Sequence, residues 1–166
     1  MKFHIPFQIL IICHANTSRS IMAHALLKKM LADRDIEHIQ IRSGGVAIYA
    51  RDNMLPSLDA RMVLRDHDIQ LRETDLSSID LKRHRHLVAQ ADLILAMTQE
   101  QKQMLDAYPE AAGKPIFTLK EFAGEEGDID DPAMQGEEAF RARMVEIRRC
   151  LEKSFEDLLR LSYERV

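Results

Sequence analysis

The chain has 166 residues, a length that fits one domain of ordinary size with a substantial core. Hydrophobic residues make up 46% of the chain and charged residues 30%, a composition typical of globular proteins. The formal net charge of -4 excludes a broadly basic surface for nucleic acid, and 2 cysteines are too few for a disulfide framework or a four-thiolate zinc site. We therefore expect a single domain over residues 1–166.

No membrane span or signal peptide is predicted. The longest apolar run, residues 9–13, has the length of a strand, whereas a spanning helix needs about 20 apolar residues. The N-terminal segment lacks the long apolar region and the cleavage site of a secretory signal. These features predict a cytoplasmic protein that has no membrane partner and no nucleic-acid partner, and we expect a monomer.

Short apolar runs alternate with amphipathic stretches, as in α/β domains with a parallel sheet. The predicted strands cover about residues 7–12, 39–41, 92–97 and 115–118. Helices are predicted from about residue 20, after Pro56, from Thr98 to about residue 107 and over about residues 137–163. A further short helix is expected within residues 72–86. The pattern indicates a three-layer, doubly wound α/β domain with a four-stranded parallel sheet.

The loop after the first strand, from Cys13 to Arg19, is the candidate functional segment. Ligands gather at the carboxyl ends of parallel strands, where loop N–H groups and a helix N-terminus favour a tetrahedral oxyanion. Arg19 can add two parallel hydrogen bonds to phosphate oxygens, and its charge favours the thiolate form of Cys13. Together these features indicate a phosphatase with a covalent intermediate. A buried, inert cysteine and a solvated arginine are the alternative interpretation.

The sequence Cys-x5-Arg-Ser at residues 13–20 resembles the low-molecular-weight protein phosphatase family. Three further segments resemble that family in the same order: Arg-Ser-Gly-Gly at 42–45, Ala-Asp-Leu-Ile-Leu-Ala-Met-Thr at 91–98 and Asp-Ile-Asp-Asp-Pro at 128–132. These four motifs cover nearly the whole chain. The resemblance implies a phosphate-binding loop after the first strand of the predicted sheet.

The resemblance also implies roles for individual residues. Cys13 would attack phosphorus and form a cysteinyl-phosphate, while Arg19 and the loop amides stabilise charge on the phosphate oxygens. Asp131 would protonate the leaving group and then activate water, with Asp128 and Asp130 as rival candidates. The loop residues that would bind the substrate are His14, Ala15, Asn16, Thr17 and Ser18.

Supporting hydrogen bonds are implied for two serines. Ser20 would support the thiolate, and Ser43 would hold the shape of the loop, as would Asn16. For Ser43 an ordinary turn residue is an equally simple interpretation. The family pattern implies no metal and no other cofactor, because the loop and the arginine supply the positive field.

Thr17 bears on the choice of substrate. The bacterial protein-arginine phosphatases resemble this chain in having threonine at this position, where tyrosine-specific members often have isoleucine. A threonine hydroxyl can form a hydrogen bond with a guanidinium group. We therefore expect phosphoarginine in a phosphorylated protein as the substrate, with phosphotyrosine as the alternative. Tyr49 is expected to line the mouth of the pocket.

Several positions depart from the family pattern. Ala15 occupies the place of a common glycine and would be strained if that position requires positive φ. Together with Ile21 and Ala133, this departure motivates a second alternative, a non-catalytic module that binds phosphoproteins. A related arsenate reductase is disfavoured, because such enzymes use further cysteines and only Cys150 is present, on the last predicted helix.

Overall fold

The computed structural model describes residues 5–164 and contains a four-stranded parallel sheet in the order β2-β1-β3-β4. The strands are β1 (Phe7–Cys13), β2 (Ile39–Gly45), β3 (Leu93–Ala96) and β4 (Ile116–Thr118). The α-helices are α1 (Arg19–Asp33), α2 (Leu58–Asp66), α3 (Arg85–Gln90), α4 (Gln99–Met104), α5 (Leu119–Phe122) and α6 (Glu137–Glu164). Two short 3-10 helices, η1 (Leu105–Ala107) and η2 (Pro109–Ala111), follow α4.

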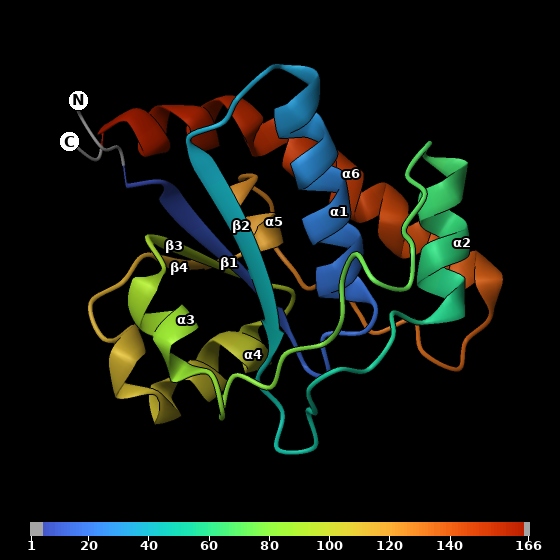
Figure 1. Ribbon diagram of the computed structural model, residues 1–166, viewed down its shortest axis with the longest axis horizontal. Helices are drawn as coiled ribbons and strands as arrows, with labels where there is room; N and C mark the ends of the chain where they lie inside the picture. Colours follow the sequence, from blue (N-terminus) through green and yellow to red (C-terminus); the bar gives the residue numbers. More distant parts are fainter. Residues whose placement is uncertain (1–4, 165–166) are drawn as a thin grey trace.

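The two faces of the sheet are both covered, so β1 is apolar and buried without interruption from residue 9 to residue 13. Ile9 and Ile11 pack into one hydrophobic cluster, and Leu10 and Ile12 pack into another, as the alternation of side chains along a strand requires. Helices α1, α2 and α6 lie on the first face, and α3 and α4 lie toward the opposite face (Figure 1). This arrangement confirms the predicted three-layer, doubly wound fold.

Helix α6 matches the predicted final helix closely. The apolar residues at helical spacing are buried, and they form one stripe against the first face of the sheet. These residues are Phe140, Met144, Ile147, Leu151, Phe155 and Leu158. None of the helices within residues 5–164 combines the length and the apolar character that crossing a membrane requires.

The short helix expected within residues 72–86 is not present; the next helix, α3, begins only at Arg85. The reason lies in a tertiary contact. Gly45 at the end of β2 donates to the carbonyl of Ile79 (2.8 Å) and accepts from the amide of Leu81 (3.1 Å), which holds this segment extended at the sheet edge. Helix α2 buries Val63 and leaves Leu58 exposed.

Candidate active site

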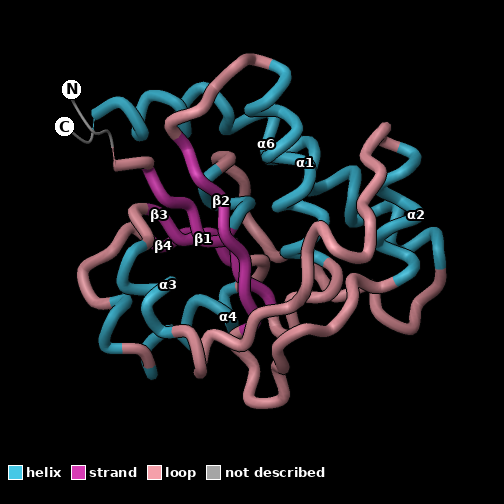
Figure 2. The backbone as a smooth tube through the Cα atoms, viewed as in Figure 1, coloured by secondary structure: helices cyan, strands magenta, loops and turns pink. Residues whose placement is uncertain are grey.

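Loop 14–18 connects the carboxyl end of β1 to the N-terminus of α1. After β1 the chain first adds β2 on one side and later places β3 on the other, so the end of β1 is a topological switch point. Ligands bind at such points in open parallel sheets. Figure 2 shows that loops gather at the end of the sheet toward which the strands run. The fold therefore places Cys13 where the sequence predicts a binding site.

The sulfur of Cys13 lies among hydrogen-bond donors. The backbone amide of Asn16 donates to Cys13 Sγ at 3.3 Å, and Ser20 Oγ lies 2.8 Å from the same atom. The Asn16 side chain is oriented by Ile79, whose amide donates to Asn16 Oδ1, so Asn16 Nδ2 donates to Ser20 Oγ at 2.7 Å. Since Ser20 Oγ accepts that bond, its own proton is available for the sulfur. Two hydrogen-bond donors are therefore directed at one sulfur.

The backbone of loop 14–18 does not have the strain that the sequence suggested for Ala15. Asn16 has a φ of 63° and is fully buried, and asparagine is among the residues that adopt this conformation most readily. Ala15 does not have positive φ, so the strain considered for alanine in place of glycine does not arise there. The departure from the family pattern at Ala15 is therefore compatible with the loop.

Arg19 connects the loop to the acidic segment before α6. Its side chain is 3% exposed, and Nη1 donates to the carbonyl of Ile129 at 2.8 Å. Its Nη2 lies 3.9 Å from Asp131 Oδ2, and the Asp131 side chain is 53% exposed. Asp128 instead accepts from the amide of Gln99 at the start of α4. The structure thus brings one of the three candidate acids next to the buried guanidinium.

Asp130, the remaining candidate acid, points in a different direction. Its Oδ2 lies 3.9 Å from Arg143 Nη1 on α6, and its side chain is 76% exposed. Asp131 also accepts a hydrogen bond from the amide of Ala133 at 3.0 Å, which fixes the orientation of its carboxylate. A half-exposed, fixed carboxylate beside a guanidinium is placed to exchange protons with a bound molecule.

Tyr49 lies on the loop between β2 and α2. Two backbone bonds fasten the start of this loop to the candidate site: the amides of Val46 and Ala47 donate to the carbonyls of Cys13 and His14, each at 3.0 Å. Burial raises the pKa of the Tyr49 phenol, and the negative charge of Asp131 raises it further. Its side chain nevertheless remains largely exposed.

The far side of loop 14–18 is attached to α2. The carbonyl of Thr17 accepts from the amide of Ser57 at 2.9 Å, and Ser18 Oγ lies 3.0 Å from Ser57 Oγ. Ser57 also caps α2 through the amide of Ala60. Within residues 5–164 the Thr17 hydroxyl has no hydrogen-bond partner, so it is available to a bound molecule.

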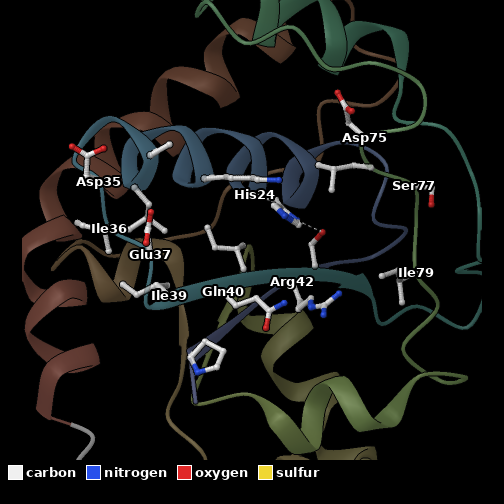
Figure 3. Close-up of a pocket in the computed structure, with 17 residues that line it drawn as sticks. His24, Asp35, Ile36, Glu37, Ile39, Gln40, Arg42, Asp75, Ser77 and Ile79 are labelled. Atoms are coloured by element: carbon white, nitrogen blue, oxygen red, sulfur yellow. Dashed lines mark hydrogen bonds between the residues drawn. The ribbon is translucent and has the colours of Figure 1, made fainter. Parts of the chain in front are cut away.

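Ser43 lies in a different environment from the predicted one. Its hydroxyl bonds to His24 Nδ1 on α1 at 2.8 Å, whereas the sequence predicted support of loop 14–18. Both residues line an open groove of about 880 Å³ between α1 and the outer edge of β2 (Figure 3). Cys13, Arg19 and Asp131 do not line this groove. Burial and, to a smaller extent, the charges of Lys28 and Arg42 together lower the pKa of His24 to about 4.

Two groups near Arg19 could not be assigned from the sequence. The carbonyl of Ile129 leaves no signal in a sequence, because every residue has one. Gln101 is part of a Thr-x-x-Gln capping box with Thr98, which a sequence pattern can reveal, although its contact with His14 cannot be predicted from that pattern.

Cys150 is fully buried on α6, where burial raises its pKa.

Three groups lie together at the carboxyl end of the parallel sheet: a thiol with two hydrogen-bond donors, a buried arginine and a carboxylate. This combination defines a class of α/β proteins that bind tetrahedral anions. No group of three or more His, Cys, Asp or Glu side chains that could hold a metal lies within the described part of the chain. The chain matches the family described as low molecular weight phosphotyrosine protein phosphatase over residues 8–163. It belongs to this family, which is the one that its sequence motifs resemble.

Characterised relatives include two bacterial enzymes of the same name. A protein-arginine-phosphatase from Geobacillus stearothermophilus is 35% identical over 156 residues, 93% of this chain and 97% of the relative. A protein-arginine-phosphatase from Bacillus subtilis is 34% identical over 125 residues, 75% of this chain and 78% of the relative. A low molecular weight protein-tyrosine-phosphatase, PtpB from Staphylococcus haemolyticus, is also 34% identical, over 75% of this chain and 80% of its own.

Solved structures agree with these similarities. The YwlE arginine phosphatase from Geobacillus stearothermophilus has a TM-score of 0.82 at 34% identity, and the match covers 97% of this chain and 98% of that chain. A YwlE arginine phosphatase mutant with a phosphorylated active-site serine also has a TM-score of 0.82, at 31% identity over 93% of this chain and 99% of that chain. The sheet and its loops therefore follow those of cysteine-dependent phosphatases.

Proposed function

We propose that this chain hydrolyses phosphoarginine in proteins through a cysteinyl-phosphate intermediate. The observation that carries the phosphatase assignment is the environment of the Cys13 sulfur, which accepts from the Ser20 hydroxyl and the Asn16 amide at the end of β1. Binding alone requires no thiolate and no acid, so Cys13 and Asp131 argue against a non-catalytic module.

The mechanism has two displacement steps. First, Cys13 Sγ attacks phosphorus in line, the bond from phosphorus to the leaving group breaks, and Asp131 gives the leaving group a proton. Then water attacks phosphorus, Asp131 takes a proton from that water, and Cys13 leaves as a thiolate as phosphate is released. Arg19 and the loop N–H groups stabilise negative charge on the equatorial oxygens in both steps.

The preference for phosphoarginine is supported by Thr17 and by the relatives. Two relatives at 35% and 34% identity are named protein-arginine-phosphatase. In phosphoarginine the bond that breaks joins phosphorus to nitrogen, and the guanidine that leaves has several N–H donors. The Thr17 hydroxyl has no partner within the described residues and can accept one of these hydrogen bonds.

A protein-tyrosine phosphatase is the second candidate function. It is favoured by the exposed Tyr49, whose ring could pack against the ring of phosphotyrosine. Ala133 and Met134, which follow the Asp-Pro motif, are not aromatic and supply no such contact. We favour phosphoarginine because Thr17 is part of the phosphate-binding loop itself.

Two peptides that differ only in carrying phosphoarginine or phosphotyrosine test the choice. We expect the unmodified protein to turn over the phosphoarginine peptide faster, and Thr17→Ile to reduce this preference by about tenfold through loss of one hydrogen bond. An equal preference in both proteins would reject the assignment. Cys13→Ser should abolish turnover, and a folded wild-type protein that binds phosphate without hydrolysing an aryl phosphate would be a binding module.

Domain organisation, location and partners complete the proposal. We propose a single phosphatase-like domain over residues 1–166, which agrees with the family match over residues 8–163. We further propose a cytoplasmic monomer that acts on phosphorylated proteins and has no nucleic-acid partner. The net charge of -4 supports the last point, because phosphate backbones attract basic surfaces.

A further inference from the structure

The His14 ring lies between two hydrogen-bond donors. His14 Nδ1 is 3.2 Å from Arg19 Nη2 and 3.0 Å from Gln101 Nε2. A guanidinium group has donors only, and the nitrogen of a side-chain amide is also a donor. If both contacts are hydrogen bonds, His14 Nδ1 must be an acceptor without a proton of its own.

The orientation of the Gln101 amide supports this conclusion. Gln101 is fully buried, and its Oε1 accepts from the backbone amides of Met97 at 2.9 Å and Thr98 at 3.3 Å. Exchanging the oxygen and the nitrogen of this amide would place an NH₂ group against two N–H donors. Gln101 Nε2 therefore faces His14, and the neutral imidazole carries its proton on Nε2. That atom lies 3.8 Å from Glu100 Oε2, a carboxylate that favours this tautomer.

Two acceptors then fix the plane of the Arg19 guanidinium. Nη1 donates to the carbonyl of Ile129, and Nη2 donates to His14 Nδ1. Ile129 is itself attached to the residue that follows β3, since its amide donates to the carbonyl of Met97 at 2.9 Å. The Nε–H group and one hydrogen of Nη2 lie on one edge of the guanidinium, and within residues 5–164 no acceptor is hydrogen-bonded to Nε. This edge is the one that can bind two phosphate oxygens in parallel.

We infer that His14, in its neutral Nε2–H tautomer, is a positioning residue that holds Arg19 in the orientation that binds phosphate. The inference rests on the function proposed above and adds a role for the residue after the nucleophile. A proton on Nδ1 would face two donors, one of them a cation, so only the neutral ring can hold Arg19. The charged groups that contact the ring are Arg19 on α1 and Glu100 on α4, and Asp131 on the acidic loop lies 3.9 Å from Arg19 Nη2.

The tautomer can be measured on the unmodified protein. Long-range ¹H–¹⁵N correlation spectra distinguish a protonated ring nitrogen from an unprotonated one. We expect the spectrum of His14 at neutral pH to show protonated Nε2 and unprotonated Nδ1. A spectrum with protonated Nδ1 would overturn the inference, and this measurement needs neither a variant nor catalytic activity.

A matched pair of variants tests the effect on Arg19. His14→Asn places an amide where Nδ1 is, so its oxygen can accept from Arg19, whereas His14→Gln places its amide where Nε2 is. We expect the dissociation constant of inorganic phosphate to rise about tenfold in His14→Gln and to stay close to the wild-type value in His14→Asn. Equal phosphate affinity of the two variants would contradict the positioning role.

Failure of the inference is distinguishable from failure of the proposed function. A wild-type protein that shows the expected tautomer and binds phosphate but hydrolyses no phosphorylated substrate would reject the function and keep the positioning role of His14. An active phosphatase whose His14 carries its proton on Nδ1 would reject the positioning role alone.

Discussion

Asn16 forms three hydrogen bonds that together shape the surroundings of the Cys13 sulfur. Its backbone amide donates to the sulfur, its side-chain amide donates to Ser20, and its side-chain oxygen accepts from Ile79. Its backbone also has the positive φ that loop 14–18 requires at this point. Aspartate tolerates the same φ but has no N–H group for Ser20, and glycine has no side chain at all. Asparagine is therefore the residue that meets both the conformational and the chemical requirement.

The role of Asp131 leads to a prediction about leaving groups. If Asp131 donates the proton, Asp131→Asn should slow substrates with poor leaving groups by at least about a hundredfold, because general acid catalysis contributes that much. Substrates with good leaving groups should be affected far less, because they depart without protonation. Steady-state rates on a series of aryl phosphates of increasing phenol pKa measure this difference.

Two neighbouring acids provide matched controls for this measurement. Asp128→Asn keeps an oxygen that can accept from the amide of Gln99, and Asp130→Asn removes only a distant charge interaction with Arg143. Both variants should keep the wild-type dependence on the leaving group. A steeper dependence in either variant, with wild-type behaviour in Asp131→Asn, would move the acid role to that residue.

At the scale of elements, the end of β2 determines how closely the phosphate-binding loop can approach the sheet. A Cβ atom on Gly45 would lie 2.7 Å from the carbonyl oxygen of His14 and 2.9 Å from the carbonyl carbon of Ala15. These are backbone atoms, which cannot rotate away as the end of a side chain can. The loop has its observed position because residue 45 has no side chain.

Gly45→Ala should therefore displace loop 14–18. We expect kcat/KM to fall by at least about tenfold and the free energy of unfolding to fall by about 1–3 kcal/mol, the usual range for overpacking. The measurements are phosphatase kinetics and urea unfolding. Gly44→Ala is the matched control, since its Cβ would meet the side chain of Leu81 at 2.5 Å on the other layer. It should lower stability with a smaller effect on kcat/KM, and equal losses of activity in both variants would contradict the prediction.

The elements that the sequence predicts well are those with a pattern of their own. The apolar runs of β1 and β3 and the helical stripe of α6 are visible locally, because burial on both faces or on one stripe leaves a periodic signal. The segment before α3 has no such pattern. Its extended backbone at Ile79 and Leu81 depends on a contact with Gly45, more than 30 positions earlier, which no local window contains.

The candidate site also contains some residues that the sequence predicts and some contacts that it does not predict. Cys13, Arg19 and Asp131 lie in motifs, so their residue types and spacing are enough to indicate their chemistry. The hydrogen-bond partner of Ser43 cannot be predicted from the sequence, because its contact with His24 depends on how α1 packs over β2. The carbonyl of Ile129 has no side-chain identity to recognise. Residue type therefore indicates which chemistry is present, and tertiary packing decides which groups support it.

The burial of His24 affects the stability of the whole molecule. Burial, aided by the charges of Lys28 and Arg42, lowers the pKa of His24 from 6.5 to about 4 in the folded state. Between these two values the unfolded chain binds a proton that the folded protein does not bind. Stability therefore rises with pH in this window; the contribution is fully present above pH 6.5 and is lost as the pH falls toward 4.

This linkage predicts a measurable dependence of unfolding on pH. Between about pH 7.5 and about pH 4.5, His24 should account for a loss of roughly 2–3 kcal/mol in the free energy of unfolding. His24→Gln can still form a hydrogen bond with Ser43 but has no proton to gain, so its stability should change less over the same range. Urea unfolding at several pH values measures both proteins, and staying above about pH 4.5 avoids most of the carboxylate titration. If the two proteins lose stability in parallel, the groove between α1 and β2 admits enough water to keep the His24 imidazolium solvated, and its burial has no consequence for folding.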